Sequence, residues 1–298
     1  MASSHVFTGR AAVLGHPIGH SKSPLLHAAA YEQLGLEIDY TRIDLEETGV
    51  EGFLQERAQE QSWLGWSVTM PLKAALVPHM AVISERVKTL GVLNTVIRQP
   101  SGALHGENTD VDGIVEALRE AGLSRASTGA AARPFGILGA GATAAAALAA
   151  AAELGFGRAV VYARSPERAA SLQPVADALG IRVSFRSFTE FASAPDAPAA
   201  VVSTLPPRAA DGLASALGEE GAVAGIPLLD VAYDPWPSAL ALAWEWAGGT
   251  VVSGLVMLLH QAVRQVELFT AAAGRPAGGQ SAQDRAAMVR RMRTAVGL

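Results

Sequence analysis

The stretch of sequence that decides the fold is FGILGAGATAAAA, which begins at Phe135 and ends at Ala147. Its first four residues are apolar and predict a buried strand. From Ala142 onward the alanines predict a helix that we expect to reach Leu154. A strand that passes into a helix through a glycine-rich turn is the first half of a βαβ unit, so this stretch predicts an α/β domain with a parallel sheet.

The turn from Gly139 to Ala144 has the pattern Gly-x-Gly-x-x-Ala. In such a turn Gly139 permits a tight bend, Gly141 lets the backbone approach a pyrophosphate, and Ala144 keeps the helix close to the sheet. The first N–H groups of the helix, at Ala142 and Thr143, have no partner within the helix and suit phosphate oxygens. The turn therefore predicts a dinucleotide site, and the alternative is a glycine-rich turn that binds no ligand.

The second strand expected in this domain, residues 159–163, indicates which dinucleotide is bound. An NAD site places Asp or Glu at the end of this strand, where the carboxylate accepts hydrogen bonds from the ribose. Here Arg164 stands at that place and Arg168 follows one helical turn later. Two guanidinium groups suit the 2′-phosphate of NADP, and cations at a helix N-terminus are otherwise unfavourable. We therefore expect NADP; the alternatives are two solvated arginines, or Glu167 as the ribose partner.

Composition and charge narrow the class of protein. The chain has 298 residues, with 23 basic and 28 acidic side chains and a net charge of −5. At about 150 residues per domain this length indicates two domains. The acidic balance argues against a nucleic-acid partner, and no run suits a membrane span or a signal peptide. Cysteine is absent, so we expect a cytoplasmic protein without disulfides, thiolate chemistry or a metal site.

Short apolar runs alternate with helical patterns along the chain, which predicts two α/β domains. In the first domain we expect strands at 11–14, 40–44, 65–68 and 92–98, and a helix at 24–34 that Ser23 caps. In the second we expect strands at 135–138, 159–163, 183–185, 200–204 and 228–232, and a helix at 166–179 that Pro174 kinks. A surface loop at 124–133 and two helices, at 254–273 and 284–296, complete the chain.

Four segments rich in polar residues lie where strands of the first domain end. They are HSKSP at 20–24, SVTMPLK at 67–73, LNT at 93–95 and ENTD at 107–110. Ligands of open α/β sheets bind at the carboxyl ends of strands. We therefore expect the first domain to hold a small-molecule substrate.

These motifs resemble those of the shikimate dehydrogenase family over nearly the whole chain. The resemblance rests on GHPIGHSKSP at 15–24, VTMPLK at 68–73, NT at 94–95, NTD at 108–110, the glycine turn, and GLVMLLHQ at 254–261. It implies reversible, NADP-dependent reduction of 3-dehydroshikimate to shikimate in the pathway to chorismate and the aromatic amino acids, by a monomer or homodimer. It also implies a substrate domain at 1–110, completed by 254–298, and a Rossmann-like doubly wound NADP-binding domain at 111–253.

The resemblance assigns roles to single residues. Ser21 and Ser23 are similar to the pair that binds the substrate carboxylate. Lys73 and Asp110 match the catalytic pair, in which the ammonium stabilises the charge that develops on the ketone oxygen. The family's groups that contact the ring hydroxyls are similar to four residues of this chain: Thr69, Asn94, Asp110 and Gln261. Tyr233 is expected near the substrate. Read separately, Lys73 is a surface lysine and Asp110 a helix cap; their combination with the other groups favours a site.

The remaining assignments concern the cofactor. Ser165 lies beside the two arginines, Thr204 ends a predicted strand of the nucleotide domain, and Gly254 lets the backbone approach the ring. Met257 precedes Gln261 by one helical turn, so one helix face can contact both nicotinamide and substrate.

The chain departs from the family pattern at three places. Ser67 stands where Asn usually precedes Val-Thr, Ala163 stands where Asn usually precedes the cofactor arginine, and STLPP at 203–207 stands where Asn-Ala-Thr is frequent. We expect His16 and His20 to bond to loop backbone rather than to zinc.

Three rival functions stay open. They are an NAD-dependent quinate-type dehydrogenase, a non-catalytic shikimate sensor and a methylenetetrahydrofolate-type dehydrogenase. Ser23 and the two arginines argue against the quinate-type dehydrogenase. The presence of Lys73 and Asp110 argues against the sensor. The Ser-Lys-Ser segment would have no evident role in a methylenetetrahydrofolate-type dehydrogenase.

Overall fold

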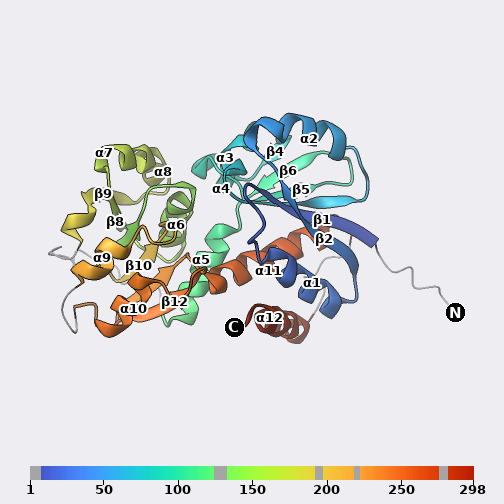
Figure 1. Cartoon of the computed structure of the whole chain (residues 1–298). Helices are drawn as coiled ribbons and strands as arrows, with labels where there is room; N and C mark the ends of the chain where they lie inside the picture. The colour runs from blue at the N-terminus through green and yellow to red at the C-terminus, as the bar shows by residue number, and fades with distance from the viewer. Residues whose placement is uncertain (1–7, 124–132, 192–196, 218–221, 275–280) are drawn as a thin grey trace. The chain divides into compact units, whose positions relative to one another are not determined.

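The computed structural model describes residues 8–123, 133–191, 197–217, 222–274 and 281–298 (Figure 1). The chain divides into two compact units. The first comprises Met1–Thr109 and Gln261–Leu298, and the second comprises Asp110–His260. The surface loop predicted at 124–133 lies outside the described residues except for its last position. Among the described helices, none has both the length and the apolar character that crossing a membrane requires.

A mixed sheet forms the centre of the first unit. Its strands are β1 (Thr8–Gly15), β2 (Glu37–Asp44), β3 (Trp63–Val68), β4 (Val82–Ile83), β5 (Thr95–Arg98) and β6 (Leu104–Glu107). They are arranged in the order β2-β1-β3-β5-β6-β4. β1 is parallel to both of its neighbours, whereas β5 is antiparallel to β3 and β6. The carboxyl ends of β1 and β3 therefore meet at one edge of the sheet.

Helices pack on both faces of this sheet. They are α1 (Ser23–Leu34), α2 (Val50–Arg57), α3 (Leu72–Ala75), α4 (Glu85–Leu90), the part of α11 (Gly254–Ala272) from Gln261 onward, and α12 (Ala282–Val296). In Figure 1 α2 lies on one face of the sheet, and α1 and α11 lie on the other. Under α2, the buried Trp66 shares a core cluster with Leu14 and Val50.

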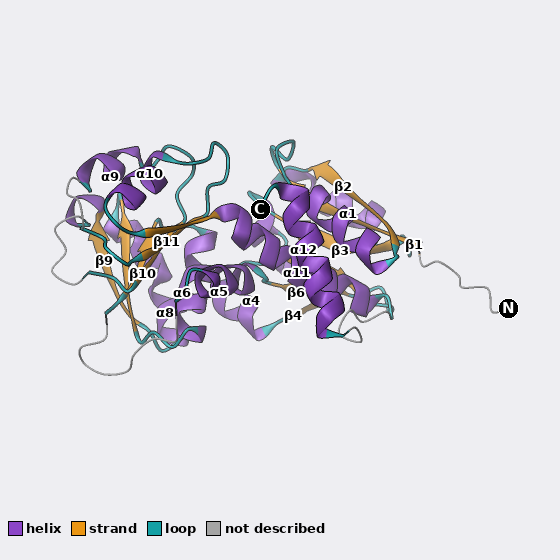
Figure 2. Cartoon of the chain, turned by 90° about the horizontal axis from the view of Figure 1, so that it is seen from below, coloured by secondary structure: helices purple, strands orange, loops and turns teal. Residues whose placement is uncertain are grey.

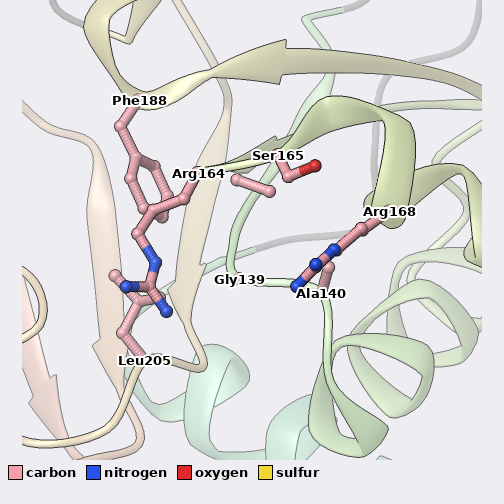
Figure 3. A pocket seen from close by; sticks show the side chains of 8 residues that line it. Gly139, Ala140, Arg164, Ser165, Arg168, Phe188 and Leu205 are labelled. Atoms are coloured by element: carbon pink, nitrogen blue, oxygen red, sulfur yellow. The ribbon is translucent and has the colours of Figure 1, made fainter.

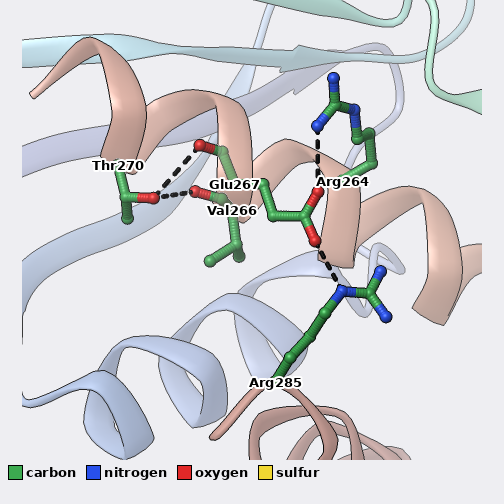
Figure 4. Close-up of polar contacts among 5 residues, drawn as sticks. All are labelled: Arg264, Val266, Glu267, Thr270 and Arg285. Atoms are coloured by element: carbon green, nitrogen blue, oxygen red, sulfur yellow. Dashed lines mark hydrogen bonds and ion pairs between the residues drawn. The ribbon is translucent and has the colours of Figure 1, made fainter. Parts of the chain in front are cut away.

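The C-terminal helix α12 is fastened to the first unit by charged as well as apolar contacts. It packs along α1 (Figure 2) and buries Met288 and Met292. Arg285 donates to Glu267 of α11 at 2.9 Å, as Figure 4 shows, and Arg291 pairs with Glu32 of α1. The C-terminal segment is therefore a helix that packs on the first unit.

The second unit is built on a fully parallel sheet. Its strands are β7 (Phe135–Leu138), β8 (Arg158–Ala163), β9 (Arg182–Ser187), β10 (Ala200–Ser203), β11 (Pro227–Asp230) and β12 (Thr250–Ser253). Their order is β12-β11-β10-β7-β8-β9, so the chain winds outward from β7 in one direction and from β10 in the other. This is the doubly wound Rossmann order, in which ligands bind where the direction reverses. The α/β fold class with a Rossmann-like half is confirmed.

Helices also cover both faces of the second sheet. They are α5 (Asp110–Glu120), α6 (Ala142–Glu153), α7 (Pro166–Ala169), α8 (Gln173–Ala178), α9 (Asp211–Ala216) and α10 (Ala239–Trp246). Figure 2 shows α9 and α10 on one side of the strands, and α5 and α6 on the other. Leu213 of α9 and Trp244 of α10 form a core cluster with Leu138 and Leu228 of the sheet.

Two helix predictions made from the sequence are wrong. The sequence predicts one kinked helix at 166–179, but the structure has α7, a 3₁₀ turn at Ala170–Leu172, and then α8. Pro174 lies in the first turn of α8, where a missing N–H is tolerated, so this proline starts a helix. The prediction that Ser23 caps α1 is wrong, because Lys22 occupies the N-cap position and Ser23 lies inside the helix.

The strands of the first sheet differ in part from those that the sequence predicts. The strand predicted at 92–98 begins only at Thr95, and two short strands, β4 and β6, have no counterpart in the prediction. β4 has two residues and β6 has four, so neither is long enough to produce a visible period.

Gly65 on β3 is a position where the fold leaves no room for a side chain. A Cβ on Gly65 would lie 2.7 Å from Cε1 of Phe269 on α11 and closer still to the Val96 carbonyl oxygen of β5. The residue has φ of +156°. Helix α11 therefore approaches the sheet at a glycine, which allows the buried Phe269 ring to lie against the backbone.

We expect Gly65→Ala to lower the free energy of unfolding by about 1–3 kcal/mol, because the added methyl displaces the Phe269 ring or the β5 backbone. Urea unfolding followed by circular dichroism measures the change. Gly52→Ala is the control, since Gly52 lies on the exposed face of α2 with nothing within 4 Å of an added Cβ. That variant is expected to gain about 0.5–1 kcal/mol. Equal stability of the Gly65→Ala variant and the wild type would contradict the close approach.

Candidate active site

The glycine turn follows β7 and lies beside the end of β10. Gly139 has φ of +105°, which favours glycine, and a Cβ there would lie 2.5 Å from Oγ1 of Thr204. Thr204 donates to the Leu138 carbonyl oxygen from its backbone N–H at 2.8 Å and from its hydroxyl at 2.9 Å. A Cβ on Gly141, in contrast, would meet nothing within 4 Å. The turn is therefore closed on the Thr204 side and open at Gly141, where a ligand can approach the backbone.

A hollow of about 450 Å³ lies at this turn. Its lining is Gly139, Ala140, Ala163, Arg164, Ser165, Arg168, Phe188 and Leu205. Figure 3 shows the Arg168 guanidinium directed toward Ala140 of the turn, and Arg164 extending past Phe188 toward Leu205. Within the part of the chain that the structure describes, neither guanidinium is in an ion pair. Two such cations beside a helix N-terminus suit the phosphate groups of a dinucleotide.

Glu167 is engaged elsewhere than in the hollow. Its Oε2 accepts a hydrogen bond from the Ser165 hydroxyl at 3.0 Å. Hydrogen bonds from the Glu167 backbone N–H and from Ser165 lower the pKa of this carboxyl. The carboxylate thus lies at the N-terminus of α7, where a negative charge is favourable. Arg164 and Arg168, and not Glu167, are the charged side chains that line the hollow.

In the first unit, the amide of Asn94 is the centre of a buried polar cluster. Its Oδ1 accepts the backbone N–H of Thr109 at 2.7 Å and the hydroxyl of Thr95 at 2.9 Å. Its Nδ2 donates to Oγ1 of Thr109 at 3.0 Å and to Oε1 of Gln261 at 3.3 Å. Asn94 is 2% exposed. The structure therefore brings together two residues predicted to bind substrate, Asn94 and Gln261.

The two charged residues predicted to be catalytic are both buried. Lys73 lies in α3 and is 9% exposed, and its carbonyl oxygen accepts the N–H of Leu93 at 2.9 Å. Asp110 is the first residue of α5 and is 6% exposed. It directly follows Thr109, which Asn94 holds. Lys and Asp are rarely this buried without a partner or a task, so the interpretation of Lys73 as a surface lysine is wrong.

The serine segment lies at the start of α1 and is fastened to β2. The Ser23 N–H donates to Oγ of Ser21 at 3.3 Å, and Ser23 is buried whereas Ser21 is half-buried. Arg42 of β2 donates to the Ser21 carbonyl oxygen from Nε at 2.9 Å and from Nη2 at 2.5 Å. At the same sheet edge, the Thr69 N–H donates to the Leu14 carbonyl oxygen at 2.9 Å. The segment at 20–24 thus follows β1, and the segment at 67–73 begins with the last two residues of β3, the strand beside β1.

The loop before the serines is held by a side chain. The expectation that His16 bonds to loop backbone is wrong, because its Nδ1 lies 2.5 Å from Oδ1 of Asp44 at the end of β2. Oδ2 of Asp44 accepts the N–H of Ile18 at 3.2 Å. One carboxylate therefore fixes both ends of the turn that contains Pro17. The hydrogen bond to Asp44 raises the pKa of His16, and its counterpart lowers the pKa of Asp44.

The remaining predicted residues belong to the second unit. Tyr233 is half-buried after β11. It follows Asp230, which accepts from the Ser238 hydroxyl at 2.6 Å and whose pKa is raised by burial. Gly254 begins α11, where a Cβ would collide with the backbone of Val231, and Met257 is 8% exposed. The predicted residues thus fall in both units. The first unit holds Ser21, Ser23, Thr69, Lys73, Asn94 and Gln261, and the second holds Asp110, Tyr233 and the nucleotide residues.

Several buried polar residues near Asn94 escape prediction from the sequence. Gln265 donates to the Asn94 carbonyl oxygen and to Oγ1 of Thr95, at 3.2 and 3.0 Å. Tyr40 donates to Oγ of Ser67 at 2.7 Å. No motif marks these residues; the available signal is that Gln265 follows Gln261 by four residues and so shares its helix face.

The parallel sheet, the Gly-x-Gly-x-x-Ala turn and the arginine-lined hollow define a Rossmann-type dinucleotide-binding protein with a second α/β unit that carries a polar cluster. A family model described as the shikimate dehydrogenase substrate binding domain matches residues 13–96. The shikimate dehydrogenase (NADP(+)) of Sphingopyxis alaskensis is 33% identical over 289 residues, which cover 94% of this chain and 96% of that protein. The chain belongs to the shikimate dehydrogenase family.

Solved structures agree with this assignment. The crystal structure of Mycobacterium tuberculosis shikimate dehydrogenase is 38% identical, with a TM-score of 0.78, and the match covers 96% of this chain and 99% of that one. A Thermus thermophilus shikimate 5-dehydrogenase, solved in complex with NADP(H) and shikimate, is 30% identical with a TM-score of 0.73 and the same coverage of both chains. The likeness extends over both units.

We expect the imidazole of His16 to titrate above its ordinary value of 6.5. A raised folded pKa means that the His16 contribution to stability is complete below about pH 6.5 and is lost as pH rises through the folded value. The Asp44 pKa is lowered, so its contribution is present above its ordinary value of 3.8 and is lost as pH falls through the folded value. Protonated His16 and ionised Asp44 are therefore paired at pH values between the folded pKa of Asp44 and the folded pKa of His16.

An NMR titration of the His16 ring protons measures this pKa. In the Asp44→Asn variant the hydrogen-bonding carboxylate is lost, and we expect the His16 midpoint to fall toward its ordinary value. Identical midpoints in the two proteins would show that Asp44 does not hold His16.

Proposed function

We propose that this chain catalyses the NADP-dependent, reversible reduction of 3-dehydroshikimate to shikimate, a step toward chorismate and the aromatic amino acids. Family membership at 33% identity over nearly the full length supports the reaction. The acid–base roles of Lys73 and Asp110 are also part of this proposal. We further propose that it acts in the cytoplasm as a monomer or homodimer, with no nucleic-acid or membrane partner.

The observation that carries the proposal is the position of the buried Asn94 between the segments of the two charged residues. The Leu93 N–H binds the carbonyl oxygen of Lys73, and the next residue, Asn94, accepts the N–H of Thr109. Asp110 follows Thr109 in the chain. The two residues Leu93 and Asn94 therefore tie the backbone that carries Lys73 to the backbone that leads into Asp110. Buried charges held beside oriented amides are typical of catalytic sites.

We assign acid–base chemistry to this pair. When bound, the dihydronicotinamide supplies the hydride that forms the new C–H bond of the alcohol. The Lys73 ammonium stabilises the negative charge that develops on the ketone oxygen as the carbonyl π bond breaks. Asp110 orients the ammonium, and the pair delivers the proton that completes the hydroxyl. In the reverse direction the same pair accepts the hydroxyl proton.

The polar groups of the first unit suit a polyhydroxylated ring acid. In this proposal Ser21 and Ser23 donate hydroxyl hydrogen bonds to the carboxylate. Thr69, Asn94 and Gln261 bind the ring hydroxyls, since each donates or accepts as the partner requires, and the Asp110 carboxylate accepts from a hydroxyl. Asp110 and Tyr233, which belong to the second unit, are also assigned to the substrate. Because Asn94 donates to Gln261 at 3.3 Å, the two amides are oriented before a ligand arrives.

The residues of the second unit fit NADP. The turn at Gly139 and Gly141, whose backbone is open at Gly141, and the first N–H groups of α6, at Ala142 and Thr143, would hold the pyrophosphate. The cations of the hollow, Arg164 and Arg168, would hold the 2′-phosphate, with Ser165 beside them. Thr204 supports the turn, and Gly254 and Met257 would lie against the nicotinamide.

The function is tested by following NADPH formation at 340 nm with shikimate and NADP⁺, and in parallel with quinate and NAD⁺. We expect the higher kcat/KM for the first pair. A preference for quinate and NAD⁺ would instead indicate a quinate-type dehydrogenase. Binding of shikimate without turnover would indicate a sensor.

Replacement of Lys73 by Ala is expected to lower kcat by about 10²–10⁴-fold, because the charge on the ketone oxygen loses its stabilisation and its proton source. The KM for shikimate is expected to change much less. Lys88→Ala is the matched control, since Lys88 is an exposed lysine of the same unit that pairs with Glu85. A kcat within a few-fold of the wild type in Lys73→Ala would refute the catalytic role.

We expect the double variant Arg164→Ala/Arg168→Ala to lower kcat/KM for NADP⁺ by about 100-fold, because charge-assisted hydrogen bonds to the 2′-phosphate are lost. The value for NAD⁺, which lacks that phosphate, is expected to stay within a few-fold. Arg182→Ala serves as the control, since Arg182 is exposed on β9 and does not line the hollow. Equal losses with both cofactors would argue against recognition of the phosphate.

A further inference from the structure

Gln265 of α11 lies at the centre of a buried hydrogen-bond network in the first unit. Its side chain is 1% exposed. Oε1 accepts the hydroxyl of Ser67 at 2.8 Å and lies 3.3 Å from Nε2 of His27. Nε2 of Gln265 donates to the Asn94 carbonyl oxygen at 3.2 Å and to Oγ1 of Thr95 at 3.0 Å. A glutamine amide has two N–H groups and two acceptor positions, so all four are used.

The direction of each hydrogen bond in this network follows from the chemistry of the groups. Oε1 of Gln265 only accepts, so Nε2 of His27 carries a hydrogen and donates to it. Burial lowers the pKa of His27 to about 3, so the ring is neutral and its Nδ1, which lies 3.1 Å from the Tyr31 hydroxyl, is an acceptor. The ring is also stacked on Tyr40 at 3.8 Å between centroids. The Asn94 carbonyl oxygen, which only accepts, fixes the orientation of the Gln265 amide, and the neutral His27 takes the tautomer that donates to Oε1.

On one side, this orientation is transmitted to Asn94. Because the Thr95 hydroxyl accepts from Gln265, its own hydrogen points to Oδ1 of Asn94 at 2.9 Å. Oδ1 therefore faces Thr95 and the Thr109 N–H, and Nδ2 faces Oε1 of Gln261. A reversed Gln265 amide would place its acceptor against the Asn94 carbonyl oxygen, which is electrostatically unfavourable.

On the other side, the network reaches Tyr40 of β2. The Ser67 hydroxyl donates to Gln265 and accepts from the hydroxyl of Tyr40 at 2.7 Å. The path from Gln265 through Ser67 to Tyr40 is buried: Ser67 is 3% exposed and Tyr40 is 8% exposed.

We propose that Gln265 is a positioning residue for substrate binding: together with Ser67 and Thr95 it fixes which face of the Asn94 amide donates and which accepts, and so sets the pattern of ring hydroxyls that the site selects. Gln265 acts through Asn94 and Gln261. The inference rests on the proposed function, because it takes these two residues as ligands of the substrate.

The test uses Gln265→Met, which keeps the length of the side chain and removes all four hydrogen bonds. We expect the KM for shikimate to rise about tenfold, because Asn94 samples a second orientation, and kcat to fall less. The KM for NADP⁺ is expected to stay within twofold, since the nucleotide residues belong to the other unit. An unchanged KM for shikimate in the folded variant would overturn the inference.

Thr270→Val is the matched control on the same helix. Thr270 is 1% exposed, and its hydroxyl donates only within α11, to the carbonyl oxygens of Val266 and Glu267 at 2.8 and 3.2 Å (Figure 4). We expect this variant to keep the wild-type KM for shikimate. An equal rise in Thr270→Val and Gln265→Met would mean that any loosening of α11 weakens binding, which would overturn a specific role for Gln265.

If Gln265→Met does not fold, a pair of variants at Thr95 tests the same inference. Thr95→Ser keeps the hydroxyl that links Gln265 to Asn94, and Thr95→Val removes it. We expect a raised KM for shikimate in the valine variant and a near-normal value in the serine variant. Equal values in the two would overturn the inference. Absence of shikimate turnover in the wild-type enzyme would refute the proposed function itself, and the inference with it.

Discussion

The hydrogen bond from the Thr109 N–H to Oδ1 of Asn94, 2.7 Å long, is the interaction on which the substrate-side residues depend. It joins the loop before β5 to the residue that precedes Asp110. Because Asn94 is 2% exposed, an amide turned the wrong way leaves buried donors and acceptors unpaired, which costs about 1–3 kcal/mol for each group. The amide therefore has one stable orientation, and Gln261 receives its hydrogen bond from a fixed direction.

The nucleotide side depends on a different constraint. Strands β7 and β10 lie side by side, and their chains leave in opposite directions, so the turn after β7 and the loop after β10 meet. Thr204 closes the remaining gap by hydrogen-bonding Leu138, which leaves space opposite only for a glycine. Backbone geometry thus prepares the turn, and the side chains of Arg164 and Arg168 supply the charge.

Residues with a local signal were predictable. The apolar run of β7, the glycine turn and the start of α6 agree with the structure, as do the helix that begins at Gly254 and the buried methionines of α12. The predictions failed where partners distant in sequence decide the outcome. His16 bonds to Asp44 rather than to its own loop. Pro174 is a local exception, since it stands in the first turn of α8 after a 3₁₀ turn and so starts a helix. The two-residue β4 exists only because β6 pairs with it.

The sequence by itself determined the two α/β units, the dinucleotide turn and the residue types available for a site, because these follow from periodicity, glycine and charge within short windows. Only the tertiary structure decided how the amides and hydroxyls of the first unit are directed. Gln265 and Thr95 are 170 residues apart, and their hydrogen bond exists because α11 packs on the sheet at Gly65. The direction of a hydrogen bond depends on every partner around it, and no local stretch of chain contains all of them.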